Sequence, residues 1–186
     1  MEKWRTKISV SHGGELYIRG IPLITLIKIN SFAEIIFLLW RSTMPTPKEV
    51  KMLDAMLVSA VEHGIAVPSS FTTRTTISTG NPLHVAIAGG ILTFGEWHGG
   101  AIEHAAEWLV SEKSPQDIIR HVVNERLRLA GFGHKIYKSA DPRAHVLLQK
   151  ARALGFNGRF ISKLESVGKE LQEKTGKVSY VRNIAK

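Results

Sequence analysis

The stretch GFGHKIYKSADPR, from Gly131 to Arg143, brings together groups that could act on an anionic substrate. A glycine hinge precedes His134, and Lys135 and Lys138 follow before the Asp141-Pro-Arg143 turn. Glycine permits backbone angles that other residues avoid, so a ligand can approach the main chain closely there. A histidine can exchange a proton near neutral pH, and the cations suit phosphates or carboxylates. The stretch therefore predicts a site for a polyanionic ligand.

Two further histidines stand beside glycines: His63 precedes Gly64, and His98 precedes Gly99-Gly100. A ring at a helix terminus meets the helix dipole, which biases its protonation state. A single His-Gly pair is commonly an ordinary helix C-cap and indicates structure alone. Three such pairs in one chain of 186 residues favour a shared role in catalysis or binding.

Other kinds of site find less support in the sequence. The chain has no Cys and no HExxH, and His98 and His104 do not share a helix face, so we expect no metal. Walker A, GxGxxG and GxSxG patterns are also missing. Ser69-Ser70 after Pro68 could supply a nucleophile, although capping of a helix is the simpler interpretation.

Helices must position most of these residues. The chain begins with alternating segments at 7–10 and 15–18 around Gly13-Gly14, which predict a short hairpin or two extended arms. Capping-box patterns then predict helix starts at Ser31 and Thr46, and a weaker one at Ser114.

Apolar residues recur at helical spacing after these starts, which predicts an all-α class with a minor extended N-terminus. Asn81-Pro82 opens a further helix whose residues 85–92 are apolar nearly all round, so we expect it to be buried on most sides. The remaining predicted helices run from Thr46 to Gly64, over 102–109, from Ser114 to Gly131, and over 144–154 and 157–174.

Composition sets limits on the class of protein. With 44% hydrophobic residues the chain can bury a core, and its net charge of +9 is spread without a basic block. A nucleic-acid-binding protein therefore stays open as a weaker alternative. The longest apolar run, 35–40, is shorter than the ~20 residues that span a bilayer. No segment resembles a signal peptide, so we expect a soluble, cytoplasmic protein without membrane contact.

Several motifs together resemble the citrate synthase superfamily. His63-Gly-Ile-Ala-Val-Pro-Ser-Ser, Ile77-Ser-Thr-Gly80, His98-Gly-Gly-Ala101 and the stretch 131–143 occur in the order and at the separations of that family. Ile18-Arg-Gly20 and Phe32-Ala-Glu34 are similar to its early segment. Citrate synthases usually carry His-Glu at the position of His63-Gly64, so the chain looks closer to citryl-CoA lyase and the C-terminal module of ATP-citrate lyase.

The resemblance implies a fold and a reaction. It predicts a citrate synthase-type large helical domain over 1–130, a coenzyme A loop with an incomplete small domain over 131–186, and a homodimer. The implied reaction interconverts citryl-CoA, or citrate plus coenzyme A, with acetyl-CoA and oxaloacetate, with a leaning to citryl-CoA lyase. A non-catalytic module that binds coenzyme A or supports oligomerisation is the main alternative on the same scaffold.

The resemblance also assigns roles to individual residues. His98 matches the histidine that stabilises the enol of acetyl-CoA, and His134 matches the one that polarises the oxaloacetate carbonyl. The residues assigned to the dicarboxylate substrate are His63, Arg143 and Asp141. The residues assigned to coenzyme A are Phe132, Gly133, Lys135 and Lys138.

Two departures from the family pattern affect the expected activity. Family members continue past Lys186 into a segment that carries an aspartate base and a further substrate arginine. Ile102 also replaces an asparagine that is common in citrate synthases. We therefore expect a C-terminally truncated, split or frameshifted chain that is impaired in isolation, or one whose missing lobe comes from a partner chain. Asp141 and Glu96 stay open as replacement bases.

Overall fold

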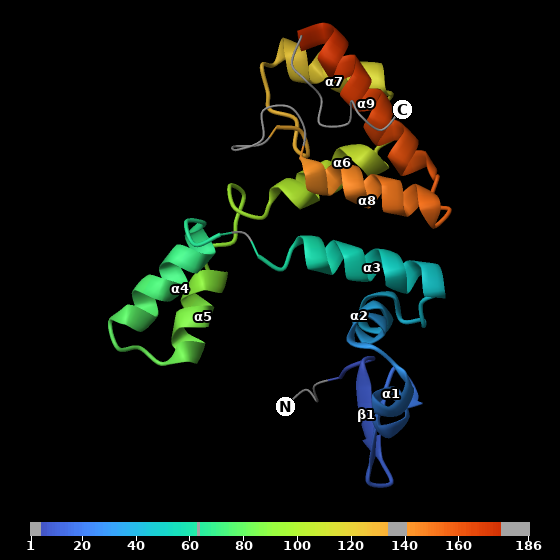
Figure 1. Ribbon diagram of the computed structural model, residues 1–186, viewed down its shortest axis with the longest axis vertical. Coiled ribbons are helices and arrows are strands. Elements are labelled where there is room, and N and C mark those ends of the chain that lie inside the picture. Colours follow the sequence, from blue (N-terminus) through green and yellow to red (C-terminus); the bar gives the residue numbers. More distant parts are fainter. Residues whose placement is uncertain (1–4, 63, 134–140, 176–186) are drawn as a thin grey trace. The chain divides into compact units, whose positions relative to one another are not determined.

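The computed structural model describes residues 5–62, 64–133 and 141–175 (Figure 1). The chain divides into two units, Met1–Val61 and Glu62–Lys186. Helices dominate both units, and the strands of the described residues lie within residues 9–22. The predicted all-α class with a short extended N-terminus is confirmed, whereas the predicted domain boundary near residue 130 stays a prediction. None of the described helices combines the length and apolar character needed to span a bilayer.

The N-terminal unit begins with the predicted hairpin. Strand β1 (Ser9–His12) pairs antiparallel with β2 (Glu15–Ile18), and β3 (Ile21–Pro22) adds to the other edge of β2. Gly13 and Gly14 form the turn with φ of +60° and +80°. Two consecutive positive φ angles are what a tight two-residue hairpin turn requires.

Arg19 links this sheet to a helix of the same unit. Its backbone takes a left-handed φ of +49°, and its guanidinium donates to the carbonyls of Lys7 (3.1 Å) and Leu39 (2.9 Å). Leu39 belongs to helix α2 (Phe32–Arg41), so one side chain joins the edge of the sheet to the end of α2. This contact gives the Ile18-Arg-Gly20 motif a structural role.

Replacing Arg19 by Ala should therefore lower the free energy of unfolding by about 2 kcal/mol, because two charged hydrogen bonds to carbonyls are lost. Urea denaturation measures the change. Arg5→Ala is the matched control, since Arg5 is exposed and should shift stability by less than about 0.5 kcal/mol. Equal effects of the two variants would contradict the linking role of Arg19.

Two capping boxes start helices of the N-terminal unit, as predicted. Ser31 and Glu34 cap α2, and Thr46 and Glu49 cap α3 (Pro47–Ser59), while α1 (Leu23–Ile29) precedes both. Hydrogen bonds from the Ser31 backbone lower the pKa of Glu34, and the hydroxyl of Thr46 lowers that of Glu49. A lowered carboxyl pKa stabilises the fold above the unfolded pKa, and this contribution is lost as pH falls through the folded value.

The second unit begins with a helix pair, α4 (Pro68–Ser78) and α5 (Leu83–Ile91), which lie side by side (Figure 1). Glycine makes their close approach possible: a Cβ on Gly90 would lie 2.1 Å from Oγ1 of Thr73. The expectation that α5 is buried on most sides is wrong for the isolated chain. Only Ala86 and Gly90 of α5 are buried, and Leu83 is 60% exposed.

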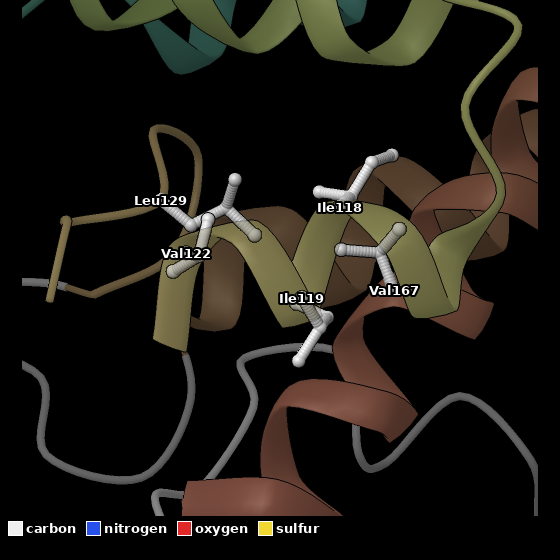
Figure 2. Packing of buried hydrophobic residues seen from close by; sticks show 5 residues of the cluster. All are labelled: Ile118, Ile119, Val122, Leu129 and Val167. Atoms are coloured by element: carbon white, nitrogen blue, oxygen red, sulfur yellow. The ribbon is translucent and has the colours of Figure 1, made fainter. Parts of the chain in front are cut away.

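The rest of this unit contains α6 (Ala101–Val110), α7 (Pro115–Asn124), α8 (Pro142–Ala153) and α9 (Arg159–Thr175). Helix α9 packs against α6 and α7. Figure 2 shows the apolar cluster that results. Trp108, Phe132 and Leu171 pack around it. The buried members of the cluster are Ile118, Ile119, Val122, Leu129 and Val167.

Helix α7 starts at the predicted Ser114 cap but ends before the predicted Gly131. Arg126 adopts a left-handed φ of +55°, and the N–H of Leu127 bonds back to the carbonyl of Val122 at 2.9 Å. This geometry is a Schellman-type helix end, which usually places glycine where Arg126 stands. Because no glycine stands at this position, the sequence does not predict that α7 ends there.

Candidate active site

His98 lies in a tight turn between α5 and α6. Its N–H and carbonyl both pair with Gly95, at 3.1 and 2.9 Å, which closes the turn on itself. Gly99 has a φ of +97°, and a Cβ there would lie 2.7 Å from the ring of Phe94. A Cβ on Gly100 would lie 2.8 Å from the carbonyl oxygen of Glu96. Both glycines after His98 are therefore required sterically.

The His98 ring is held by two neighbours. Its Nε2 lies 3.1 Å from Oγ of Ser69 on α4, and the Phe94 ring stacks on it with centroids 4.8 Å apart. Ser69 was expected to cap a helix or act as a nucleophile. The capping expectation is wrong, because Val67 is the N-cap of α4 and no side chain caps it. The hydroxyl bonds His98 instead, across 29 positions of sequence.

An open groove of about 400 Å³ adjoins these residues and includes Ser69 and Phe94 in its lining. Glu62 and Gly64, which flank His63, also line it, and the Glu62 carboxylate accepts from the Gly64 N–H at 2.5 Å. Arg74 adds an exposed cation that sequence reasoning missed, because it stands alone in a Thr-rich segment. The remaining lining residues are Ile65, Ser70, Thr73, Ile87, Gly90 and Ile91.

Asp141 and Arg143 lie together at the start of α8. Asp141 is the N-cap and accepts from the Arg143 N–H at 2.9 Å. Its carboxylate also accepts from the Arg143 guanidinium, with Nη2 2.7 Å from Oδ2 and Nε 3.1 Å from Oδ1. Both carboxylate oxygens thus accept from Arg143, which orients the guanidinium.

Phe132 and Gly133 lie in the segment after α7. The Phe132 ring tilts against Trp108 at a centroid distance of 5.9 Å and packs on the α7–α9 core. The Trp108 Nε1–H donates to the carbonyl of Ala130 at 3.0 Å, so the start of the glycine hinge is anchored from two sides. Gly133 is exposed with a φ of +99°. A ligand contact at Phe132 would therefore use its main chain more readily than its ring.

The other predicted site residues, His63, His134, Lys135 and Lys138, lie outside the described residues. The structure thus places His98 against Ser69 and Phe94, two residues that line the groove, and Asp141 with Arg143 at one helix start. It does not bring the two groups into contact through any described hydrogen bond or ion pair.

Comparisons with known proteins identify the family of the chain. Residues 43–184 match the family described as citrate synthase, C-terminal domain. The chain is 36% identical over 115 residues to putative citrate synthase 2 of Mycobacterium tuberculosis, across 60% of this chain and 31% of that protein. It is 35% identical over 115 residues to peroxisomal citrate synthase 1 of Arabidopsis thaliana, across 60% of this chain and 24% of that protein. The chain spans under a third of the length of these curated relatives.

Solved structures give the same picture over more of the chain. Citryl-CoA lyase from Hydrogenobacter thermophilus has a TM-score of 0.89 and 40% identity, across 95% of this chain and 71% of that one. ATP citrate lyase from Methanothrix soehngenii, in complex with citrate and coenzyme A, has a TM-score of 0.86 and 24% identity. The match covers 97% of this chain and 31% of that one. At 24% identity, the similarity to ATP citrate lyase shows a shared fold.

Proposed function

Because the chain belongs to the citrate synthase family, we propose that it interconverts citryl-CoA with acetyl-CoA and oxaloacetate, chiefly in the direction of cleavage. The citryl-CoA lyase relative supports this direction, since it is 40% identical over 95% of the chain. The observation that carries the proposal is the placement of His98, held by Ser69 and Phe94 where both line an open groove. A cytoplasmic location is part of the same proposal.

Cleavage of citryl-CoA makes two demands on the protein. A base takes the proton of the substrate hydroxyl, the adjacent carbon–carbon bond breaks, and its electron pair forms the enolate of the acetyl thioester. The hydroxyl carbon becomes the ketone of oxaloacetate, and the enolate carbon then takes up a proton to give acetyl-CoA. Negative charge develops on the thioester oxygen, so a fixed hydrogen-bond donor at that oxygen lowers the barrier.

His98 is the proposed donor to that oxygen. A Ser69 hydroxyl that donates to Nε2 fixes the proton of the neutral ring on Nδ1, which is then available to the substrate. Phe94 covers one face of the ring and limits its rotation. His134 is the proposed partner for the ketone oxygen, by resemblance to the family. His63 is proposed to bind the dicarboxylate, by the same resemblance.

Arg143 is proposed to bind a substrate carboxylate, because a guanidinium can donate to both carboxylate oxygens. Asp141, predicted as a substrate ligand, is better assigned to holding Arg143 in place, given their paired geometry. Coenzyme A is proposed to bind along the segment from Phe132 and Gly133 to Lys135 and Lys138, where the lysines would meet phosphates.

Incubation of the purified chain with citryl-CoA tests the proposal. Oxaloacetate release is followed through malate dehydrogenase and NADH, and binding of citryl-CoA and coenzyme A is measured by calorimetry in parallel. Release of oxaloacetate that depends on His98 supports the lyase. Binding without turnover would instead support a non-catalytic module that binds coenzyme A. A chain that neither binds nor cleaves citryl-CoA would refute both readings.

Ser69→Ala should lower kcat for citryl-CoA cleavage by about fivefold to tenfold, because the variant loses one hydrogen bond that orients the His98 ring. KM should change little, since Ser69 is proposed to act through His98. Ser69→Thr keeps a hydroxyl and should recover most of the rate. Steady-state kinetics of the three proteins measures the effect. A loss in Ser69→Thr as large as in Ser69→Ala would argue against the hydrogen bond and for simple crowding.

A homodimer is the assembly that the exposed apolar surface of the second unit supports. Leu83 and Leu92 at the two ends of α5 are 60% and 84% exposed, and Phe71 on α4 is 63% exposed. Large apolar side chains exposed on a soluble chain are commonly covered by a partner when they gather in one patch. Sedimentation velocity should give twice the chain mass of 20.6 kDa. Leu92→Glu should shift the protein to monomer, whereas Val146→Glu, at an exposed position of α8, should not.

A further inference from the structure

A second pocket, of about 190 Å³, lies between the end of α6 and the first turn of α9, beside the Ser111–Lys113 link. It shares no lining residue with the groove at Ser69. Three cationic side chains line it, from Lys113, Arg159 and Lys163, against one carboxylate, from Glu112. The pocket therefore carries a positive excess at a place that the proposed reaction does not use.

One of these cations has a structural explanation. Lys163 donates to the carbonyl of Ser111 at 2.5 Å, and Ser111 is the C-cap of α6. A cation at a helix C-terminus is stabilised by the helix dipole. An ammonium group has three N–H donors, so Lys163 can make this contact and still donate into the pocket.

The other two cations have no such explanation. Arg159 begins α9, whose first turn contains no acidic residue, and a cation there opposes the helix dipole. Neither Arg159 nor Lys113 forms an ion pair within the described part of the chain, although Glu112 lines the same pocket. The Arg159 guanidinium lies 4.8 Å over the Phe160 ring, which holds it at the pocket.

We propose that this pocket binds the phosphate group of a small organic phosphate. A phosphate dianion would match the two unexplained charges and the remaining donor of Lys163, whose other two N–H groups reach the carbonyl and hydroxyl of Ser111. Arg can meet phosphate oxygens with two parallel hydrogen bonds. N–H groups at the start of α9 add to the attraction for an anion. Leu109, Val110 and Phe160 supply apolar walls, which suit an organic group attached to the phosphate. The proposal does not rest on the reaction at His98.

NMR titration of the whole chain with inorganic phosphate, AMP and adenosine tests the proposal. Amide signals of Ser111 to Lys113 and of Arg159 to Lys163 should shift with phosphate and shift at lower concentration with AMP. Adenosine should leave them unchanged, since it lacks the phosphate. Equal responses to AMP and adenosine, or no response to any probe, would overturn the proposal. Phosphate binding without a preference for AMP would overturn the organic part of it.

Charge variants of the pocket sharpen the test. Lys113→Gln and Arg159→Gln should each weaken AMP binding about tenfold, the effect of losing one charge-assisted hydrogen bond. Glu112→Gln removes the opposing carboxylate and should strengthen AMP binding. Lys169→Gln, on the same helix outside the pocket, makes the same change in net charge and should have little effect. If Lys169→Gln weakened binding as much as Arg159→Gln, net charge alone would explain the result and the pocket would be rejected.

Discussion

Replacing His98 by Ala is expected to slow citryl-CoA cleavage by about 10²–10³-fold, the usual loss when one donor to a developing oxyanion is removed. The turn that carries His98 is closed by its own backbone hydrogen bonds and by two sterically required glycines. The ring can therefore be removed without loss of the turn. The change should appear in kcat, because the donor matters most when charge develops on the thioester oxygen.

A matched control lies six positions along the chain (104 − 98). His104 is exposed on α6 and pairs with Glu107 at 3.3 Å, so His104→Ala removes an imidazole without touching the groove. Its rate should stay within about twofold of the parent chain. Circular dichroism checks that both variants are folded. A His98→Ala chain with near-parental kcat would remove His98 from the reaction, whatever its contacts with Ser69.

The helix starts that the sequence predicted correctly depend on local chemistry. Ser31 with Glu34 and Thr46 with Glu49 satisfy the free N–H groups of their own first turns, so the pattern and the structure involve the same few residues. The Ser114 cap of α7 is confirmed for the same reason. Capping motifs of this kind can be predicted from the sequence because their hydrogen bonds involve only neighbouring residues.

Features that depend on tertiary packing were missed. Helix α4 is rich in Thr and Ser and lacks an apolar stripe, so neither propensity nor periodicity marks it. It forms because it packs against α5, a contact that no local sequence pattern predicts. The Ser69–His98 pair was missed for the same reason, since its partners come from different helices and loops. A Ser in the first turn of a helix looks like a cap until its partner is known.

The same dependence on packing yields the last prediction, at two adjacent glycines of α5. Gly90→Ala should destabilise the chain by about 2–3 kcal/mol, because the new Cβ would lie 2.1 Å from Oγ1 of Thr73 and 2.9 Å from the carbonyl oxygen of Ser69. Gly89→Ala should be neutral or stabilising by up to about 1 kcal/mol, since its nearest contact is 3.4 Å, from Thr76, and Ala favours a helix. Thermal unfolding measures both.

A double variant separates the two clashes at Gly90. Thr73→Ala removes the Oγ1 that lies 2.1 Å away, so Gly90→Ala with Thr73→Ala should recover part of the lost stability. The carbonyl of Ser69 cannot be removed, so recovery should be incomplete. Because Ser69 also bonds His98, Gly90→Ala should slow citryl-CoA cleavage even at temperatures where it stays folded. If Gly89→Ala and Gly90→Ala had the same effect on stability and on the rate, α4 and α5 would not approach closely at Gly90. The proposal that Ser69 positions His98 would then lose its support.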